Sequence, residues 1–195
     1  MTEPSIEKAF SGHDQVIRSL QGSTELLQRM ADVLIESLQA GGKVLLFGNG
    51  GSAADAQHIA GELLGRFGRE RAALAAVALS TDTSTITAIG NDYGFDRIFA
   101  RQVEALIRPH DAAWALSTSG NSANVVLALE AARNRGAKTL AFSGGDGGRL
   151  AQVAELCLVV PGKESCRIQE AHQLAYHILC DLVESALAQG HTSQS

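Results

Sequence analysis

Short apolar runs alternate with segments of helical periodicity along most of this chain. Each run is bounded by glycine or polar residues, as expected for a parallel strand that is covered on both faces. Repeated alternation of strand and helix indicates a parallel sheet with helices on both sides. The sequence therefore predicts a doubly wound α/β fold with a five-stranded parallel sheet, whose strands are 43–47, 74–79, 112–116, 139–142 and 156–160.

Two predicted helices precede the first strand, at residues 3–21 and 24–40. A doubly wound sheet does not need them, so they either cover one face of the sheet or form a surface for oligomerisation. Because 195 residues suit one domain, we expect a single domain over residues 1–195, with N-terminal helices at about 3–40 and an α/β core at about 43–188. The helices predicted within that core are 52–66, a short one within 81–92, 95–107, 123–135, 149–154 and 164–188, followed by a frayed tail, GHTSQS.

The composition is that of an ordinary globular protein, with 45% apolar and 19% charged residues. A net charge of −5 gives no electrostatic basis for binding nucleic acid or an anionic membrane. No apolar run approaches the roughly 20 residues of a membrane helix, and the N-terminus lacks the pattern of a signal peptide. The cysteines, Cys157, Cys166 and Cys180, have no C-x-x-C spacing and are expected to be reduced thiols. We expect a cytoplasmic protein with no nucleic-acid and no membrane partner.

A glycine-rich turn, GNGGS, connects the first strand to the helix that follows it. Its glycines permit a sharp turn and close approach of a ligand, and Ser52 is predicted to cap the helix. An anion can bind at such a helix start without a basic side chain. The stretch also fits the dinucleotide pattern G-x-G-x-x-A, but the ribose-binding acid expected about 20 residues later is missing, because Asp82 comes too late. A tight turn without a ligand is the alternative.

A second polar turn, STSGNS, follows the third predicted strand. Hydroxyl groups and backbone N–H groups suit the phosphate monoester of a small molecule. Capping of the next helix is the alternative, but one serine suffices for that, and this turn offers four hydroxyls. Since parallel strands end at one edge of the sheet, both polar turns are expected to meet there. The SGGDGG turn at 143–148 is better explained by turn geometry and is left unassigned.

His58 and Glu62 are four residues apart on one helix face, where they can act as a metal-binding or acid/base pair. The last predicted helix carries Gln169 and His177, which lie about 12 Å apart along the helix axis. At this separation the two side chains cannot easily touch each other, but they could both contact a group that lies between them. The sequence does not say whether this helix packs against the helix with His58 and Glu62 in the same chain or in a neighbouring one. Three further histidines, which fall in segments expected at the surface, are assigned no role: His13, His110 and His191.

Four stretches together resemble the phosphoheptose isomerases, which belong to the sugar isomerase (SIS) fold: FGNGGSAADAQH, TITAIGNDYGF, ALSTSGNSANV and RIQEAHQLAYH. The resemblance extends over nearly the whole chain, to about residue 188. It implies an SIS-type fold and the isomerisation of sedoheptulose 7-phosphate to D-glycero-D-manno-heptose 7-phosphate through an ene-diol. That reaction is an early step in the synthesis of ADP-heptose and of the lipopolysaccharide core.

The resemblance also implies the site. One zinc ion per subunit would be held by His58, Glu62, Gln169 and His177, and Glu62 and His177 would be the acid/base residues, with the assignment of base and acid left open. The family forms homotetramers with active sites at subunit contacts. The substrate contacts that carry over are Asn49, Gly50, Gly51, Ser52, Glu62, Asn91, Asp92, Ser117, Thr118, Ser119, Ser122 and Gln169.

Two alternatives remain. The AQH…RF and CDLVE segments also resemble a non-catalytic SIS-type regulator that binds the replication initiator. In that class the positions that match Glu62 and His177 are replaced, whereas this chain has both, which favours an enzyme. The other alternative is a different sugar-phosphate isomerase on the same scaffold.

Overall fold

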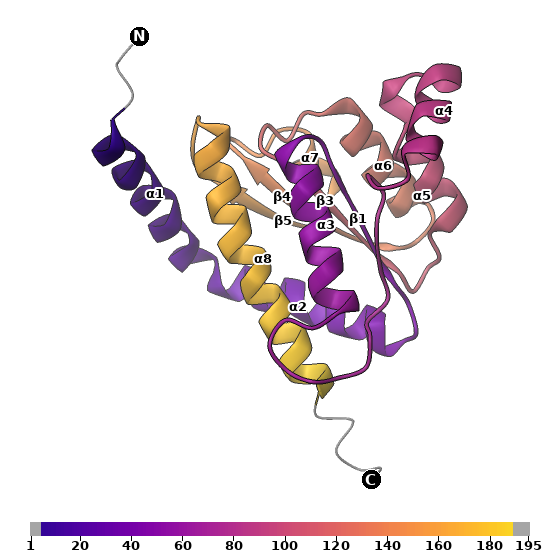
Figure 1. Ribbon diagram of the computed structural model, residues 1–195, viewed down its shortest axis with the longest axis horizontal. Helices are drawn as coiled ribbons and strands as arrows, with labels where there is room; N and C mark the ends of the chain where they lie inside the picture. Colours follow the sequence, from indigo (N-terminus) through magenta and orange to yellow (C-terminus); the bar gives the residue numbers. More distant parts are fainter. Residues whose placement is uncertain (1–4, 189–195) are drawn as a thin grey trace.

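A five-stranded parallel sheet forms the centre of the computed structural model, which describes residues 5–188 (Figure 1). The strand order is β2-β1-β3-β4-β5, and all neighbours are parallel. The predicted α/β fold is confirmed, whereas His191 and the predicted frayed tail lie outside the described residues. The strands are β1 (Val44–Gly48), β2 (Ala76–Ala78), β3 (Ala112–Ser117), β4 (Lys138–Gly144) and β5 (Leu156–Val160).

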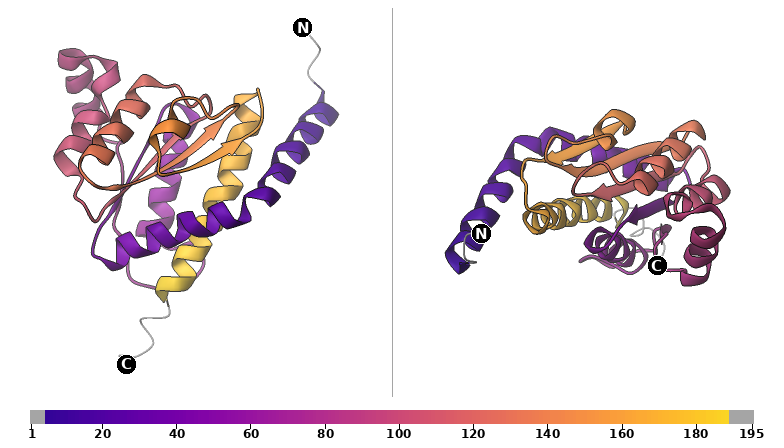
Figure 2. Two further views of the ribbon diagram at one scale, coloured as in Figure 1. Left: turned by 180° about the vertical axis from the view of Figure 1, so that it is seen from behind. Right: turned by 90° about the horizontal axis from the view of Figure 1, so that it is seen from above.

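Helices cover both faces of the sheet, as the view from above in Figure 2 shows. The segment predicted as one helix over 95–107 is divided into a 3₁₀ helix and a short α-helix. Within residues 5–188, no helix combines the length and the hydropathy needed to cross a bilayer. The helices are α1 (Ile6–Leu20), η1 (Gln21–Ser23), α2 (Thr24–Gln39), α3 (Gly51–Leu64), α4 (Thr83–Tyr93), η2 (Phe95–Arg97), α5 (Ala100–Leu106), α6 (Ala123–Asn134), α7 (Leu150–Val153) and α8 (Ser165–Ala188).

Alternation along the strands divides the core into two layers. In β1, Val44 and Leu46 pack into the layer formed with α1, α2, α3 and α8. Leu45 and Phe47 point the opposite way, into the layer formed with α5, α6 and α7. Because every residue of β1 is buried, the strand is apolar on both faces, which is why it reads as a continuous run in the sequence.

The strand order reverses direction between β1 and β3, at the centre of the sheet. At such a switch point the loops after the two strands separate and leave a crevice at the carboxyl edge, where open α/β sheets bind ligands. The two loops are joined at their base by a reciprocal pair of amide hydrogen bonds between Asn49 and Asn124, of 2.8 and 2.9 Å. The fold therefore places both predicted ligand turns beside each other.

The two N-terminal helices have different positions. Helix α2 packs against α8 and the sheet, whereas α1 extends away from the body along the N-terminal part of α8 (Figures 1 and 2). On α1, Ile6 and Phe10 are 72% and 69% exposed. His13, to which the sequence assigned no role, pairs through Nδ1 with Glu170 of α8 at 2.9 Å. Helix α2 thus covers a sheet face, while α1 presents apolar side chains to the exterior.

His172 of α8 is fully buried under the sheet edge and should make folding sensitive to acid. Its Nε2 is 3.1 Å from the Ser143 carbonyl, and burial lowers its pKa to about 4 from 6.5, against the effect of that hydrogen bond. Between these two pH values the unfolded chain binds a proton that the folded chain does not, so stability falls as the pH is lowered. We expect the free energy of unfolding to decrease by roughly 3 kcal/mol more in the wild type than in a His172→Gln variant between pH 6.5 and 4.

Denaturant unfolding at fixed protein concentration, repeated across this pH range, measures that difference. The exposed His110 supplies the control, because His110→Gln removes an imidazole from the surface and leaves the core intact. Parallel pH profiles for the wild type and His172→Gln would contradict the expectation.

Candidate functional site

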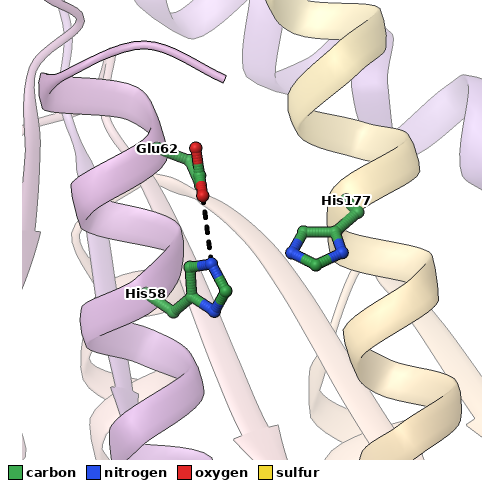
Figure 3. A group of neighbouring side chains, drawn as sticks. All are labelled: His58, Glu62 and His177. Atoms are coloured by element: carbon green, nitrogen blue, oxygen red, sulfur yellow. Dashed lines mark hydrogen bonds and ion pairs between the residues drawn. The ribbon is translucent and has the colours of Figure 1, made fainter. Parts of the chain in front are cut away.

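Two histidines and a glutamate meet between α3 and α8 (Figure 3). His58 and Glu62 lie one turn apart on α3, and His177 faces them from α8. One possible ligand atom from each residue lies within 4.8 Å of the others, and His58 Nε2 is 3.0 Å from Glu62 Oε1. The structure therefore shows that α3 and α8 of one chain bring these three residues together, which the sequence left open.

Aromatic rings line this cluster on the α8 side. The ring of His177 is 5.1 Å from that of His58, 4.7 Å from Tyr176 and 5.6 Å from Phe67. Burial and the neighbouring His58 lower the pKa of His177, while Glu62 opposes the shift. A lowered pKa favours the neutral imidazole near pH 7, and that form can accept a proton or bind a metal ion.

The donor set fits a zinc site. Two imidazoles and one carboxylate are a usual set of protein ligands for catalytic zinc, which leaves further positions for water or substrate. Glu62 and His177 are partly buried and His58 is exposed, and the three side chains come from two packed helices, so the fold sets their spacing. This geometry supports metal binding by His58, Glu62 and His177.

Gln169 belongs to α8, and its side chain lies against the start of α3 instead of within this cluster. A Cβ atom added to Gly51 would be 2.4 Å from Gln169 Nε2, so the amide rests directly on the glycine-rich turn. Gly51 precedes His58 by seven residues, about 10 Å along the helix. The structure thus groups Gln169 with the predicted substrate turn, and its predicted role as a metal ligand stays a prediction.

The glycine-rich turn differs from the sequence prediction in its cap. Helix α3 begins at Gly51, and its cap is Gly50, which has a φ of +55°. Ser52 was predicted to be the cap, and this is wrong: its side chain makes no capping bond, and it is buried against Gly48. Because glycine adopts positive φ at little cost, the cap lies two residues earlier than the predicted serine cap. The N–H groups at the helix start remain free of a side-chain cap.

Hydroxyl groups gather in the turn after β3. Ser117 Oγ lies 3.4 Å from Ser119 Oγ and 3.2 Å from Ser122 Oγ, and Thr118 donates to Ser165 Oγ at 3.3 Å. Ser122 occupies the N-cap position of α6, but its side chain makes no capping hydrogen bond. Capping therefore does not explain these hydroxyls, and their clustering at the sheet edge suits recognition of an oxyanion such as phosphate.

The SGGDGG turn after β4 packs against the hydroxyl-bearing turn after β3. Ser143 Oγ donates to the Gly147 carbonyl at 2.9 Å, and Asn121 Oδ1 accepts from the backbone N–H of Arg149 at 3.1 Å. Gly120 has a φ of +64°, and a Cβ there would lie 2.1 Å from the Gly147 carbonyl oxygen. The glycines of both turns are thus required for close packing of one turn on the other.

Asn91 and Asp92 lie on the last turn of α4. Both are exposed, and Asn91 Nδ2 donates to Asp92 Oδ1 at 2.8 Å. Their side chains are thus available at the surface, and their predicted contact with substrate stays a prediction.

Two residues next to the cluster were missed by the sequence analysis. The Tyr176 hydroxyl is 2.9 Å from His58 Nδ1, and burial raises the pKa of this tyrosine. Asp55 lies one turn before His58 on α3, and burial raises its pKa to about 6, although His58 and hydrogen bonding by Tyr176 oppose the shift. Asp55 stands at i−3 to His58, a spacing that places it on the same helix face and that was available as a signal.

This chain matches known proteins over most of its length. The family model described as SIS domain matches residues 13–144, more than half of the chain. The chain is 51% identical to a phosphoheptose isomerase of Helicobacter hepaticus over 180 residues, covering 92% of each sequence. The solved phosphoheptose isomerase of Neisseria gonorrhoeae superposes with a TM-score of 0.87 and 43% identity, covering 92% of this chain and 97% of the other. That of Francisella tularensis gives a TM-score of 0.89 and 38% identity, covering 92% and 96%.

Proposed function

This chain belongs to the phosphoheptose isomerase family of SIS-domain proteins, and we propose that it converts sedoheptulose 7-phosphate to D-glycero-D-manno-heptose 7-phosphate. The observation that carries the proposal is the cluster of His58, Glu62 and His177, which places a carboxylate and two imidazoles within 4.8 Å of one another. The product is an early precursor of ADP-heptose and of the lipopolysaccharide core. Relatives named phosphoheptose isomerase do not favour the alternative of a regulator that binds the replication initiator.

The reaction moves one hydrogen between neighbouring carbons. Glu62 removes the proton from C1 of the ketose while a proton is delivered to the carbonyl oxygen at C2, which gives an ene-diol. Glu62 then returns the proton to C2, and the hydroxyl proton at O1 leaves as the aldehyde forms. His177 moves the protons at O1 and O2 of the substrate. This role suits an imidazole whose pKa is lowered, because the neutral form is then favoured. The two roles are exchangeable on this geometry.

Zinc would be held by His58, Glu62 and His177, with Gln169 as the predicted fourth ligand. When bound, it would polarise the carbonyl oxygen and stabilise developing negative charge. A carboxylate that binds a metal ion is less basic. Glu62 would therefore act as the base when its carboxylate is released from the metal and faces the substrate carbons. His58 has no proton-transfer role in this scheme and holds its position through Tyr176.

The turns at the sheet edge would hold the rest of the substrate. The hydroxyls of the turn after β3 are the proposed phosphate contacts, and the glycine-rich turn with Gln169 borders the chain of hydroxyl-bearing carbons. Fixing the phosphate sets which carbons reach Glu62, and such positioning is a large part of catalysis. Asn49, Asn91 and Asp92 are the remaining proposed contacts.

We propose a homotetramer in the cytoplasm. Two features support a subunit contact at this place. They are an apolar groove of about 410 Å³ between α1, α2 and α8, which a second copy of the chain would fill, and the exposed apolar residues of α1. Sedimentation should give a mass near four times 20.5 kDa, and Leu174→Glu in the groove should give a smaller species. A monomeric wild type would contradict the proposal. The apolar residues that line the groove are Ile17, Leu20, Leu27, Leu174, Ile178 and Leu182, and the polar ones are Gln21, Thr24 and Gln28.

Turnover of sedoheptulose 7-phosphate by purified protein tests the function, before and after removal of metal by a chelator and return of zinc. Turnover that is lost with the chelator and restored by zinc supports both the isomerase and the metal. Turnover that the chelator does not change supports the isomerase activity and contradicts a catalytic role for the metal. No turnover in any metal state by a folded oligomer contradicts the isomerase, and turnover of a different ketose phosphate alone would change the substrate.

A further inference from the structure

A hydrogen-bonded chain leads away from the cluster behind His58. His58 has Glu62 Oε1 at 3.0 Å from Nε2 and the Tyr176 hydroxyl at 2.9 Å from Nδ1. Tyr176 is 1% exposed, and its ring packs edge-on against that of His58, with 5.4 Å between centroids. Both nitrogens of this imidazole are therefore engaged, and the orientation of the ring is fixed from two sides.

Asp55 forms the far end of this chain. It stands three residues before His58 on the same face of α3, and the Tyr176 hydroxyl is close enough to its carboxyl group to lower the pKa of Asp55 in part, against the effect of burial. Its Oδ2 atom is buried and has no hydrogen-bond partner among residues 5–188. A buried carboxylate oxygen without a donor is costly, so its position beside a hydroxyl needs an explanation.

The explanation lies in the single hydrogen of the phenol. A carboxylate only accepts, so with no metal present the proton of neutral His58 sits on Nε2, which donates to Glu62. The bare Nδ1 then accepts the hydrogen of Tyr176, and Asp55 is left without it. If Nε2 binds a metal ion, it must be bare, so the ring proton moves to Nδ1 and donates to the Tyr176 oxygen. The phenol hydrogen is then free to be donated to Asp55 Oδ2.

We propose that Tyr176 and Asp55 are positioning residues that select the metal-binding tautomer of His58. In the metal-bound arrangement every group in the chain is satisfied, from Nδ1–H to the Tyr176 oxygen and from the Tyr176 hydroxyl to Asp55. Partners behind a metal-bound histidine fix its tautomer and orientation, and their loss typically weakens metal binding by about 10- to 100-fold. This inference rests on the proposed metal site.

Zinc affinity of the full-length protein, measured by competition with a chromophoric chelator, tests the proposal. Tyr176→Phe removes only the hydroxyl and should weaken zinc binding by about 10- to 100-fold. Asp55→Asn should weaken it as a single variant and add little in the Tyr176→Phe background, because the link between them is already broken. Tyr93→Phe is the matched control, since the chain has only one other tyrosine, and it is exposed.

A second measurement uses the wild type alone and does not depend on the folding of a variant. With ¹⁵N-labelled histidine, His58 should carry its proton on Nε2 without metal and on Nδ1 with zinc. A Tyr176→Phe protein that binds zinc within twofold of the wild type, or a His58 that keeps its proton on Nε2 with zinc bound, overturns the proposal. A wild type that binds no zinc overturns the metal site itself, which separates that failure from failure of the positioning chain.

Discussion

Replacing Glu62 with glutamine should lower kcat for sedoheptulose 7-phosphate by about 10²- to 10⁴-fold, the usual contribution of a general base. Glutamine keeps the size of the side chain and an oxygen that can accept from His58 Nε2, 3.0 Å away, but it cannot remove a proton from carbon. Assays at saturating zinc separate this loss from weaker metal binding. Substrate binding should change much less than kcat, because the phosphate turn is untouched.

Glu155→Gln provides the matched control for that experiment. Glu155 precedes β5, at the opposite edge of the sheet from the ligand turns, and its only charged partner among the described residues is the exposed Lys138, at 3.1 Å. This variant should turn over substrate like the wild type. A folded, zinc-loaded Glu62→Gln protein with normal kcat would remove Glu62 from the mechanism and leave His177 as the candidate base.

The fold was largely predictable because buried parallel strands leave a direct signal. Every residue from Val44 to Phe47 is buried, so the strand appears in the sequence as a continuous apolar run without polar residues. The weakest strand prediction was 74–79, of which only Ala76–Ala78 is strand. This strand lies at the edge of the sheet and pairs only with β1, so fewer of its residues are held in the ladder and Val77 is 40% exposed.

From the residues alone, the site was predictable only where local spacing determines it, and His177 was placed with His58 and Glu62 by the family resemblance. The i, i+4 rule placed His58 beside Glu62, but no local rule brings α8 to α3, since 115 residues separate Glu62 from His177. The error at Ser52 has a different, local origin: the backbone conformation of Gly50 decides where α3 starts. Tyr176 was missed because an aromatic residue on an apolar helix face is most often plain core.

A buried carboxylate near the end of α8 holds the segment that follows the site. Glu184 is 1% exposed and accepts from the backbone N–H groups of Phe67, Gly68 and Arg69, at 2.9, 2.7 and 2.8 Å. Burial acts to raise its pKa, but these three donors and Arg71 outweigh it and lower the pKa overall. Glu184 is therefore an ionised group whose charge is neutralised locally by backbone donors and by one buried guanidinium.

Arg71 connects this carboxylate to α3, the helix that carries His58 and Glu62. Its side chain is 2% exposed, and its Nε is 3.4 Å from Glu184 Oε1. Its guanidinium also donates to the carbonyl of Glu62 at 2.7 Å and to that of Leu63 at 2.9 Å, which satisfies the C-terminal end of α3. The pair thus fixes α3, the loop carrying Phe67 and α8 relative to one another, around His177.

Glu184→Ala should lower the free energy of unfolding by about 3 to 5 kcal/mol, because it leaves Arg71 buried without its partner and three N–H groups without an acceptor. Denaturant unfolding at fixed protein concentration measures the change. The matched control is Glu155→Ala, which breaks an exposed pair with Lys138 and should cost less than about 1 kcal/mol. Equal losses in the two variants would show that the Glu184 carboxylate does not hold the loop. A loss confined to Glu184→Ala, accompanied by weaker zinc binding, would show that this buried pair also sets the spacing between Glu62 and His177.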